Sequence, residues 1–326
     1  MTKRALIIGI DYYSEIGSLS GCVNDAYSVK SVLEWNSDGT KNFDVMTVVS
    51  AGSENPITRS ELRRLIQKLF EGRAETALLY FAGHGYMESS GGYLCASDTV
   101  DGHDGLALSD IMQFSNSSAI TNKIIVLDCC HSGIASSITG RTDISELKEG
   151  TTILTASTSD QPSQETENGG VFTNLFIDAL NGAAANLLGD ITPGSVYAHI
   201  DQSLSSWEQR PVFKTNVESF VSLRKTHSPV SISDLKSLIE FFPSAGAIYP
   251  LDPSFEPERS SDDSALPQPD ELNVHKLKTL QKLNRVNLVV PANGAPNMWS
   301  AAIQSKGCQL TVLGEHYRTL VEKGHI

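Results

Sequence analysis

The chain has 326 residues, of which 40% are apolar, so it can bury a sizeable core and is not disordered throughout. Its formal net charge of −13 argues against non-specific binding of the whole protein to nucleic acid. No run approaches the roughly 18 apolar residues of a membrane span, and the first residues lack signal-peptide features, so we expect a cytoplasmic protein without membrane partners.

Strands and helices alternate through the first half of the chain. Apolar runs typical of strands lie at 4–10, 43–50, 75–82, 123–128 and 151–157. Apolar residues recur at helical spacing in segments 21–35, 57–70 and 106–114, and Thr58 with Glu61 has the spacing of a capping box. This alternation predicts an α/β domain with a mostly parallel sheet.

The same domain continues to about residue 226. We predict helices at 171–180 and 195–207, followed by an edge strand at 210–214, because Pro211 does not suit a central strand. Residues 1–226 are therefore expected to form one three-layer domain.

The remaining residues have a different composition. Residues 227–273 are predicted as a helix at 231–242 followed by a linker, because 252–271 contains four prolines and seven acids against one base. Residues 274–326 hold seven Lys/Arg against two acids, a net charge of +5. Helices at 275–288 and 310–324, with strands at 287–292 and 298–304 between them, predict a small basic α+β module resembling a winged helix.

Two apolar strands deliver chemically active residues into turns. Residues 75–82 lead to Gly83, His84 and Gly85, and residues 123–128 lead to Cys129 and Cys130. Because the carboxyl ends of parallel strands meet at one edge of a sheet, we expect the imidazole and a thiol to lie close together. A thiol becomes a strong nucleophile when a base takes its proton, so the pattern predicts a Cys-His dyad.

The other thiols are expected to be reduced and to pack in the core. The cysteines are Cys22, Cys95, Cys129, Cys130 and Cys308, without the CxxC spacing of a zinc site. Cys129, Cys130 and His131 are adjacent and cannot easily converge on one ion, so no metal site is predicted.

Four motifs in this order carry a resemblance: IIGIDYY, GCVNDA, LLYFAGHGY and VLDCCHSG. Over residues 3–224 the chain resembles the caspase-like cysteine peptidases, and among them most of all the metacaspases. The resemblance implies the three-layer caspase/hemoglobinase fold and a cysteine endopeptidase that needs no cofactor for its chemistry. Whether calcium is required, as in some metacaspases, the sequence leaves open.

The resemblance also assigns catalytic roles. Cys130 takes the position of the nucleophile, His84 that of the general base, and Cys129 a variable position whose thiol is expected to pack beneath the strand end. The oxyanion hole would be formed by the backbone N–H groups of Gly85 and Cys130. His131 receives no catalytic role.

Two carboxylates are implied to set the specificity. Asp25 and Asp128 match the metacaspase residues that line the pocket for the side chain before the scissile bond. Acids in that pocket imply protein substrates with Arg or Lys at this position. From residues alone, a helix-surface Asp25 and a solvated Asp128 are the simpler interpretation.

The loop at 133–150 is polar and bounded by glycines. It carries Arg141 and Lys148, which are candidate sites of self-cleavage by an enzyme of this specificity.

The C-terminal module is expected to keep the protease idle until a signal arrives. Its positive charge against a domain of opposite sign favours reversible docking. Bacterial caspase-like proteins with such modules resemble anti-phage effectors that cause cell death, in which a TIR-type partner makes a nucleotide-derived messenger of the cyclic ADP-ribose type. Candidate contacts for this messenger are Arg285, Trp299, Lys306 and Arg318; core filling is the alternative role of Trp299.

Two other functions stay open at this point. A catalytically silent scaffold with a caspase-like fold is one, although the presence of both His84 and Cys130 argues against it. The other is a DNA-binding regulator acting through residues 274–326, although few arginine or aromatic side chains are available there to read bases.

Overall fold

The computed structural model describes residues 2–88, 91–129, 147–156, 165–166, 169–205, 210–217, 219–258 and 266–326. The described chain divides into two compact units, Met1–His227 and Ser228–Ile326. None of the described helices has the length and apolar character needed to cross a membrane.

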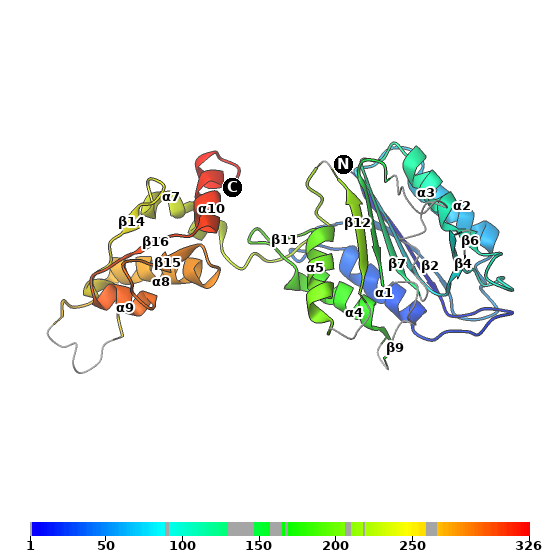
Figure 1. Ribbon diagram of the computed structural model, residues 1–326, viewed down its shortest axis with the longest axis horizontal. Coiled ribbons are helices and arrows are strands. Elements are labelled where there is room, and N and C mark those ends of the chain that lie inside the picture. Colours follow the sequence, from blue (N-terminus) through cyan, green and yellow to red (C-terminus); the bar gives the residue numbers. More distant parts are fainter. Residues whose placement is uncertain are drawn as a thin grey trace. The chain divides into compact units, whose positions relative to one another are not determined.

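A mostly parallel sheet forms the centre of the first unit (Figure 1). Its described strands are β1 (Lys3–Ile10), β2 (Asp44–Ser50), β3 (Thr76–Ala82), β7 (Asn122–Asp128), β8 (Thr151–Thr155) and β12 (Val212–Asn216). They follow the order β12-β8-β7-β3-β1-β2, and β12 alone among them runs antiparallel to its neighbour. The predicted fold class is confirmed for this unit, with the segment after Pro211 at the sheet edge.

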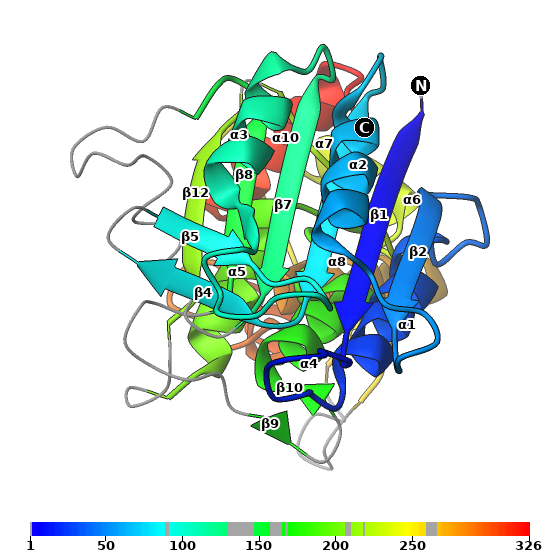
Figure 2. The same cartoon turned by 90° about the vertical axis from the view of Figure 1, so that its right-hand side faces the viewer.

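Helices cover both faces of this sheet (Figure 2). They are α1 (Cys22–Leu33), α4 (Val171–Asp178) and α5 (Pro193–Ser203) on one face and α2 (Arg59–Phe70) and α3 (Leu108–Ser117) on the other. Strand β3 is buried along its whole length. Leu79 and Phe81 belong to the core under α2 and α3, whereas Leu78 and Tyr80 belong to the core under α1 and α4. Burial on both faces explains why these strands are continuous apolar runs.

A small antiparallel sheet follows β3 directly. It consists of β4 (Gly85–Glu88), β5 (Gly91–Leu94) and β6 (Leu106–Ala107), in that order. The sequence did not predict these strands, because they are short and two of the four residues of β5 are glycines, which have low strand propensity. His84 lies between β3 and β4 and is therefore held by two sheets.

Helix α1 begins in close contact with β1. A Cβ atom at Gly9 would lie 2.3 Å from the carbonyl oxygen of Cys22, so only glycine allows this approach. The contact fixes the first turn of α1, which contains Asp25.

The second unit packs helices against a small antiparallel sheet. Its described strands are β14 (Ile248–Tyr249), β15 (Val289–Pro291) and β16 (Cys308–Leu310), in the order β14-β16-β15. Its helices are α6 (Ile232–Lys236), α7 (Leu238–Phe241), the 3₁₀ turn η3 (Pro253–Phe255), α8 (Glu271–Arg285), α9 (Met298–Ile303) and α10 (Val312–Glu322). The resemblance to a winged helix stays a prediction.

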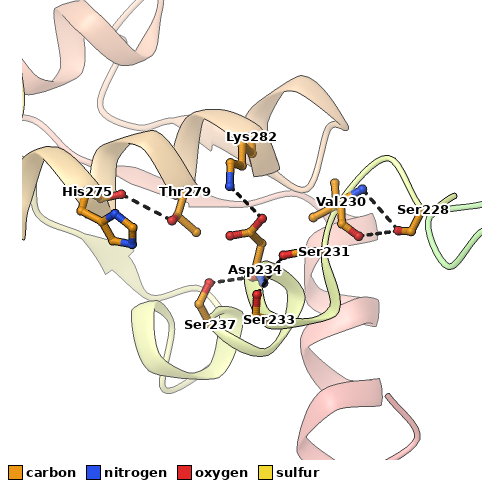
Figure 3. A network of polar contacts seen from close by, with 9 residues as sticks. All are labelled: Ser228, Val230, Ser231, Ser233, Asp234, Ser237, His275, Thr279 and Lys282. Atoms are coloured by element: carbon orange, nitrogen blue, oxygen red, sulfur yellow. Dashed lines mark hydrogen bonds and ion pairs between the residues drawn. The ribbon is translucent and has the colours of Figure 1, made fainter.

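Polar contacts tie the start of this unit to α8 (Figure 3). The Ser231 side chain accepts a hydrogen bond from the backbone N–H of Asp234 at 3.0 Å and so caps α6. The Asp234 carboxylate in turn lies 3.1 Å from the Lys282 ammonium group. Segment 228–236 is therefore part of the second unit.

Much of the segment predicted as a linker instead belongs to this unit. The side chains of Asp252 and Asp270 cap η3 and α8, and Pro253 occupies the first turn of η3. Phe255 is buried, and η3 packs against α8. Prolines and acids are typical of helix N-termini as well as of linkers, which is why the composition was misleading.

The structure also changes two further expectations about the second unit, which concern the segment 298–304 and the net charge. The predicted strand at 298–304 is wrong: Met298–Ile303 forms α9, whose first turn is capped by Asn297, and Met298, Ala301 and Ala302 are buried at helical spacing. Residues 228–326 hold nine Lys/Arg and eleven Asp/Glu, a net charge of −2. The unit as a whole is therefore not basic.

Candidate active site

The imidazole of His84 is held by the loop that follows β1. Nε2 lies 2.7 Å from the carbonyl oxygen of Gly17, and the ring packs against Tyr13 with centroids 4.7 Å apart. A carbonyl oxygen only accepts hydrogen bonds, so Nε2 carries a proton and the neutral ring keeps Nδ1 as an acceptor. A fixed orientation with Nδ1 as the basic nitrogen is suited to proton abstraction.

The Tyr13 hydroxyl supports the backbone at the same turn. It accepts a hydrogen bond from the His84 N–H at 2.7 Å. Burial raises the pKa of Tyr13 well above its ordinary value, so the hydroxyl stays neutral. A Cβ atom at Gly83 would lie 2.7 Å from this oxygen, which explains the glycine before the histidine.

Strand β7 brings the segment of the predicted nucleophile next to this turn. Strands β3 and β7 are paired in parallel up to Ala82 and Asp128, and the Gly83 N–H continues the ladder by donating to the Asp128 carbonyl at 3.3 Å. His84 and Cys130 each stand two residues beyond this last pair in the sequence. Cys130 itself lies outside the described residues, as do His131 and Arg141.

Two other residues near these turns lie within the described chain. Cys129 is 2% exposed and belongs to the core under α2 and α3, which fits the packing role expected for its thiol. Gly85 opens β4 and pairs with Leu94 of β5.

The carboxylates of Asp25 and Asp128 meet at the start of α4. The Gly170 N–H donates to Asp25 Oδ2 at 3.3 Å. A Cβ atom at Gly170 would lie 2.9 Å from Asp128 Oδ2 and 3.5 Å from Asp25 Oδ2. The two acids, which come from α1 and β7, are thus brought together, and Asp25 is only 4% exposed rather than on a helix surface.

A hydroxyl group that the sequence did not point to holds Asp128, and a second one contacts the first. Thr173 in the first turn of α4 donates a hydrogen bond to Asp128 Oδ2, and its own oxygen lies 2.5 Å from the Tyr80 hydroxyl. Burial raises the pKa of Tyr80 well above its ordinary value, and the charges of Asp128 and Asp25 raise it further. Tyr80 was predicted only as part of an apolar strand, and no local motif marks Thr173.

The remaining candidate residues belong to other parts of the chain. Lys148 is exposed, and its N–H lies 3.4 Å from the Asn116 side chain. In the second unit Arg285 is exposed and Lys306 is half-buried. Trp299 is 40% exposed, so it is not core filler, and its Nε1–H donates to the Glu258 carbonyl at 3.3 Å.

Arg318 differs from these residues because it is only 7% exposed. Its guanidinium group donates to the carbonyl oxygens of Phe242 and Pro243 at 2.6 and 2.8 Å and pairs with Glu322 at 3.2 Å. These contacts satisfy carbonyl groups at the end of α7. These contacts within its own unit give Arg318 a structural role, and its predicted ligand contact stays a prediction.

The chain is similar in sequence to known proteins. The caspase domain family matches residues 2–227. Metacaspase-3 of Arabidopsis thaliana is 31% identical over 105 residues, which cover 31% of this chain and 28% of that protein. Metacaspase-3 of Trypanosoma cruzi is 28% identical over 150 residues, which cover 40% of each chain. The chain thus aligns with less than half the length of these relatives.

Solved structures show the same fold at lower identity. Caspase-1 from Spodoptera frugiperda matches with a TM-score of 0.50 and 18% identity, covering 69% of this chain and 91% of that one. A Geobacter sulfurreducens protein matches with a TM-score of 0.51 and 17% identity, covering 70% of this chain and 98% of that one.

Proposed function

Because the chain belongs to the caspase domain family, we propose that it is a cysteine endopeptidase with Cys130 as nucleophile and His84 as general base. The observation that carries the proposal is the paired ends of β3 and β7, with His84 fixed by the Gly17 carbonyl two residues beyond the last pair. Nucleophilic catalysis by cysteine requires an oriented base close to the thiol, and neighbouring strands that lead to His84 and to Cys130 in the sequence suit this requirement.

The reaction proceeds in two stages. His84 takes the thiol proton at Nδ1, the Cys130 sulfur attacks the peptide carbonyl, and the N–H groups of Gly85 and Cys130 stabilise the oxyanion. The C–N bond then breaks while His84 returns the proton to the leaving amine. Water, activated by His84, hydrolyses the thioester and restores the thiol.

We propose that Asp25 and Asp128 select Arg or Lys before the scissile bond. Their convergence at Gly170 supports this specificity, because two carboxylates in a partly desolvated pocket favour a cation. The same specificity makes Lys148, and Arg141 in the sequence, candidate sites of self-cleavage.

Cleavage of a peptide library by wild type and variants, with and without cell extract, tests the proposal. Cys130→Ala and His84→Ala should each lose about 10²- to 10⁴-fold or more in kcat/KM, and Cys129→Ala should keep most of the activity. If Cys130→Ala is active and Cys129→Ala is inactive, the proposal has assigned the role of nucleophile to the wrong thiol. Cleavage after Asp and never after Arg or Lys would rule out the specificity.

We further propose that residues 228–326 act as a sensor that keeps the peptidase idle until a nucleotide-derived messenger binds. The exposed Trp299 ring and the cations of Arg285 and Lys306 support a ligand of this class. Attraction between units of opposite sign has no part in the proposal, because this unit carries a net charge of −2. A TIR-type partner in anti-phage defence and cell death is the proposed source of the messenger.

The sensor role predicts an enzyme that is nearly inactive alone and is activated by a small heat-stable metabolite. Trp299→Ala should lose this activation and keep the fold. Full activity without any additive, unchanged when residues 228–326 are deleted, would contradict the role. Salt-sensitive DNA binding by the full chain would instead favour the rival function of a DNA-binding regulator.

A further inference from the structure

A cavity of about 430 Å³ adjoins His84 on the side of the small sheet. Its wall includes His84 and Gly85 together with Ile16, which precedes α1, and Tyr86 of β4. The loop between β5 and β6 contributes Asp101. The cavity is thus bounded by two residues proposed for catalysis, His84 and Gly85, by the loop that holds His84, and by residues around β4 to β6 that have no other assigned role.

The Tyr86 ring is held in place on this wall. Gly102 has a φ of +86°, and a Cβ atom there would lie 2.4 Å from Tyr86 Cγ, so any other residue would displace the ring. His103 packs edge-on against Tyr86 at 4.9 Å, and its Nδ1 lies 2.6 Å from Glu88. The Tyr93 hydroxyl donates to the other Glu88 oxygen at 2.9 Å. The aromatic surface is therefore rigid before any ligand arrives.

The cavity also has a defined charge. Among the described residues of its wall, Asp101 is the one carboxylate, and it is exposed. The Cys95 thiol at the same wall is buried, which raises its pKa to about 12 and keeps it uncharged. A negative group next to an aromatic ring suits a long basic side chain, whose methylenes pack on Tyr86 and Ile16.

The direction of the substrate follows from the chemistry. His84 gives its proton to the leaving amine, so the residue after the scissile bond must leave on the side of His84. Asp25 and Asp128 serve the residue before the bond and lie against α4, not in this cavity. We propose that the cavity beside His84 binds the side chain that follows the scissile bond and selects Lys or Arg there. This inference rests on the proposed peptidase function and names its substrates as dibasic sequences.

The test uses internally quenched peptides that share Arg before the bond and differ only after it. Wild type should cleave the peptide with Arg after the bond about 10- to 100-fold more efficiently than the peptide with Gln, and Asp should be poorest. Asp101→Asn should remove the preference for Arg over Gln and leave the rate on the Gln peptide unchanged. Asp98→Asn is the matched control, because Asp98 lies three residues away and caps the Arg59 N–H at 2.8 Å instead.

An arginyl coumarylamide tests the peptidase function separately from the proposed cavity, because it offers no amino acid after the bond. Asp101→Asn and wild type should cleave it equally well. If wild type, with or without cell extract, cleaves neither the peptides nor this amide, the peptidase function is wrong and the inference fails with it. If wild type cleaves the amide but treats Arg, Gln and Asp peptides alike, or Asp98→Asn behaves like Asp101→Asn, only the inference is overturned.

Discussion

Each unit contains a buried charged residue, Asp25 in the first unit and Arg318 in helix α10 of the second, but the surroundings of the two charges differ. Asp25 is 4% exposed and Arg318 is 7% exposed. Arg318 is surrounded by groups of opposite polarity, namely two carbonyl oxygens and the Glu322 carboxylate. Asp25 instead lies near a second carboxylate, that of Asp128, at Gly170.

This difference separates a structural charge from a functional one. Two carboxylates near each other repel, so packing alone does not explain the pair of acids. Both carboxylates would attract a cationic substrate side chain. Arg318 has its counter-charges within its own unit, and its position follows from the carbonyl groups at the end of α7.

Among the substitutions that test this difference, Asp25→Asn should have the largest effect on activity. Removing the charge should lower kcat/KM for substrates with Arg or Lys before the bond by about 10- to 100-fold, the size of a charge-assisted hydrogen bond. The midpoint of thermal unfolding should stay the same or rise, because one of two like charges has been removed from the interior. Activity assays and thermal denaturation of the same preparations measure both effects.

A destabilised but active Asp25→Asn would assign Asp25 to the fold. Asp110→Asn is a useful control, because it removes the same charge at a position away from the site. The Asp110 carboxylate in α3 pairs with Arg63 in α2.

Arg318→Met should show the opposite pattern. It leaves the carbonyl groups of Phe242 and Pro243 and the Glu322 carboxylate without their donor, which should cost about 2–4 kcal/mol of stability in the second unit. Hydrogen exchange should accelerate in α7 and α10 and remain unchanged in β3 and β7. Arg285→Met, at an exposed position, is the control that should leave exchange in α7 and α10 unchanged. Unaltered exchange in Arg318→Met, combined with lost activation, would return Arg318 to the proposed ligand contacts.

The strand-end chemistry could be predicted from the sequence because it depends on local patterns. Continuous apolar runs fix β3 and β7, and the residues directly after such strands must emerge at one edge of a parallel sheet. His84 was identified by this argument, and the structure places it in the turn after β3.

The residues that contact His84 and Asp128 could not be predicted from the sequence, for a physical reason. Gly17 contacts His84 through a carbonyl oxygen, which every residue possesses, so no side chain marks the contact. Thr173 reaches Asp128 across 45 residues of sequence, and its type is common in helices and turns alike. The linker was wrongly predicted for a different reason. Asp252 and Asp270 are helix caps, but aspartate is also common in disordered segments, so the composition does not distinguish the two roles.

The smallest predicted effect concerns how the acid pair is held. Thr173→Val removes the hydroxyl that joins Asp128 to Tyr80 and preserves the shape of the side chain. Without this donor, Asp128 is less firmly oriented toward a cation, and kcat/KM for arginyl substrates should fall about three- to tenfold, mainly through KM. Thr155→Val is the matched control: this threonine is also fully buried, but its hydroxyl has no hydrogen-bond partner among the described residues. Thr173→Ser should restore most of the loss. Equal effects of Thr173→Val and Thr155→Val would show that the hydroxyl of Thr173 contributes only to packing and does not orient Asp128 toward the substrate.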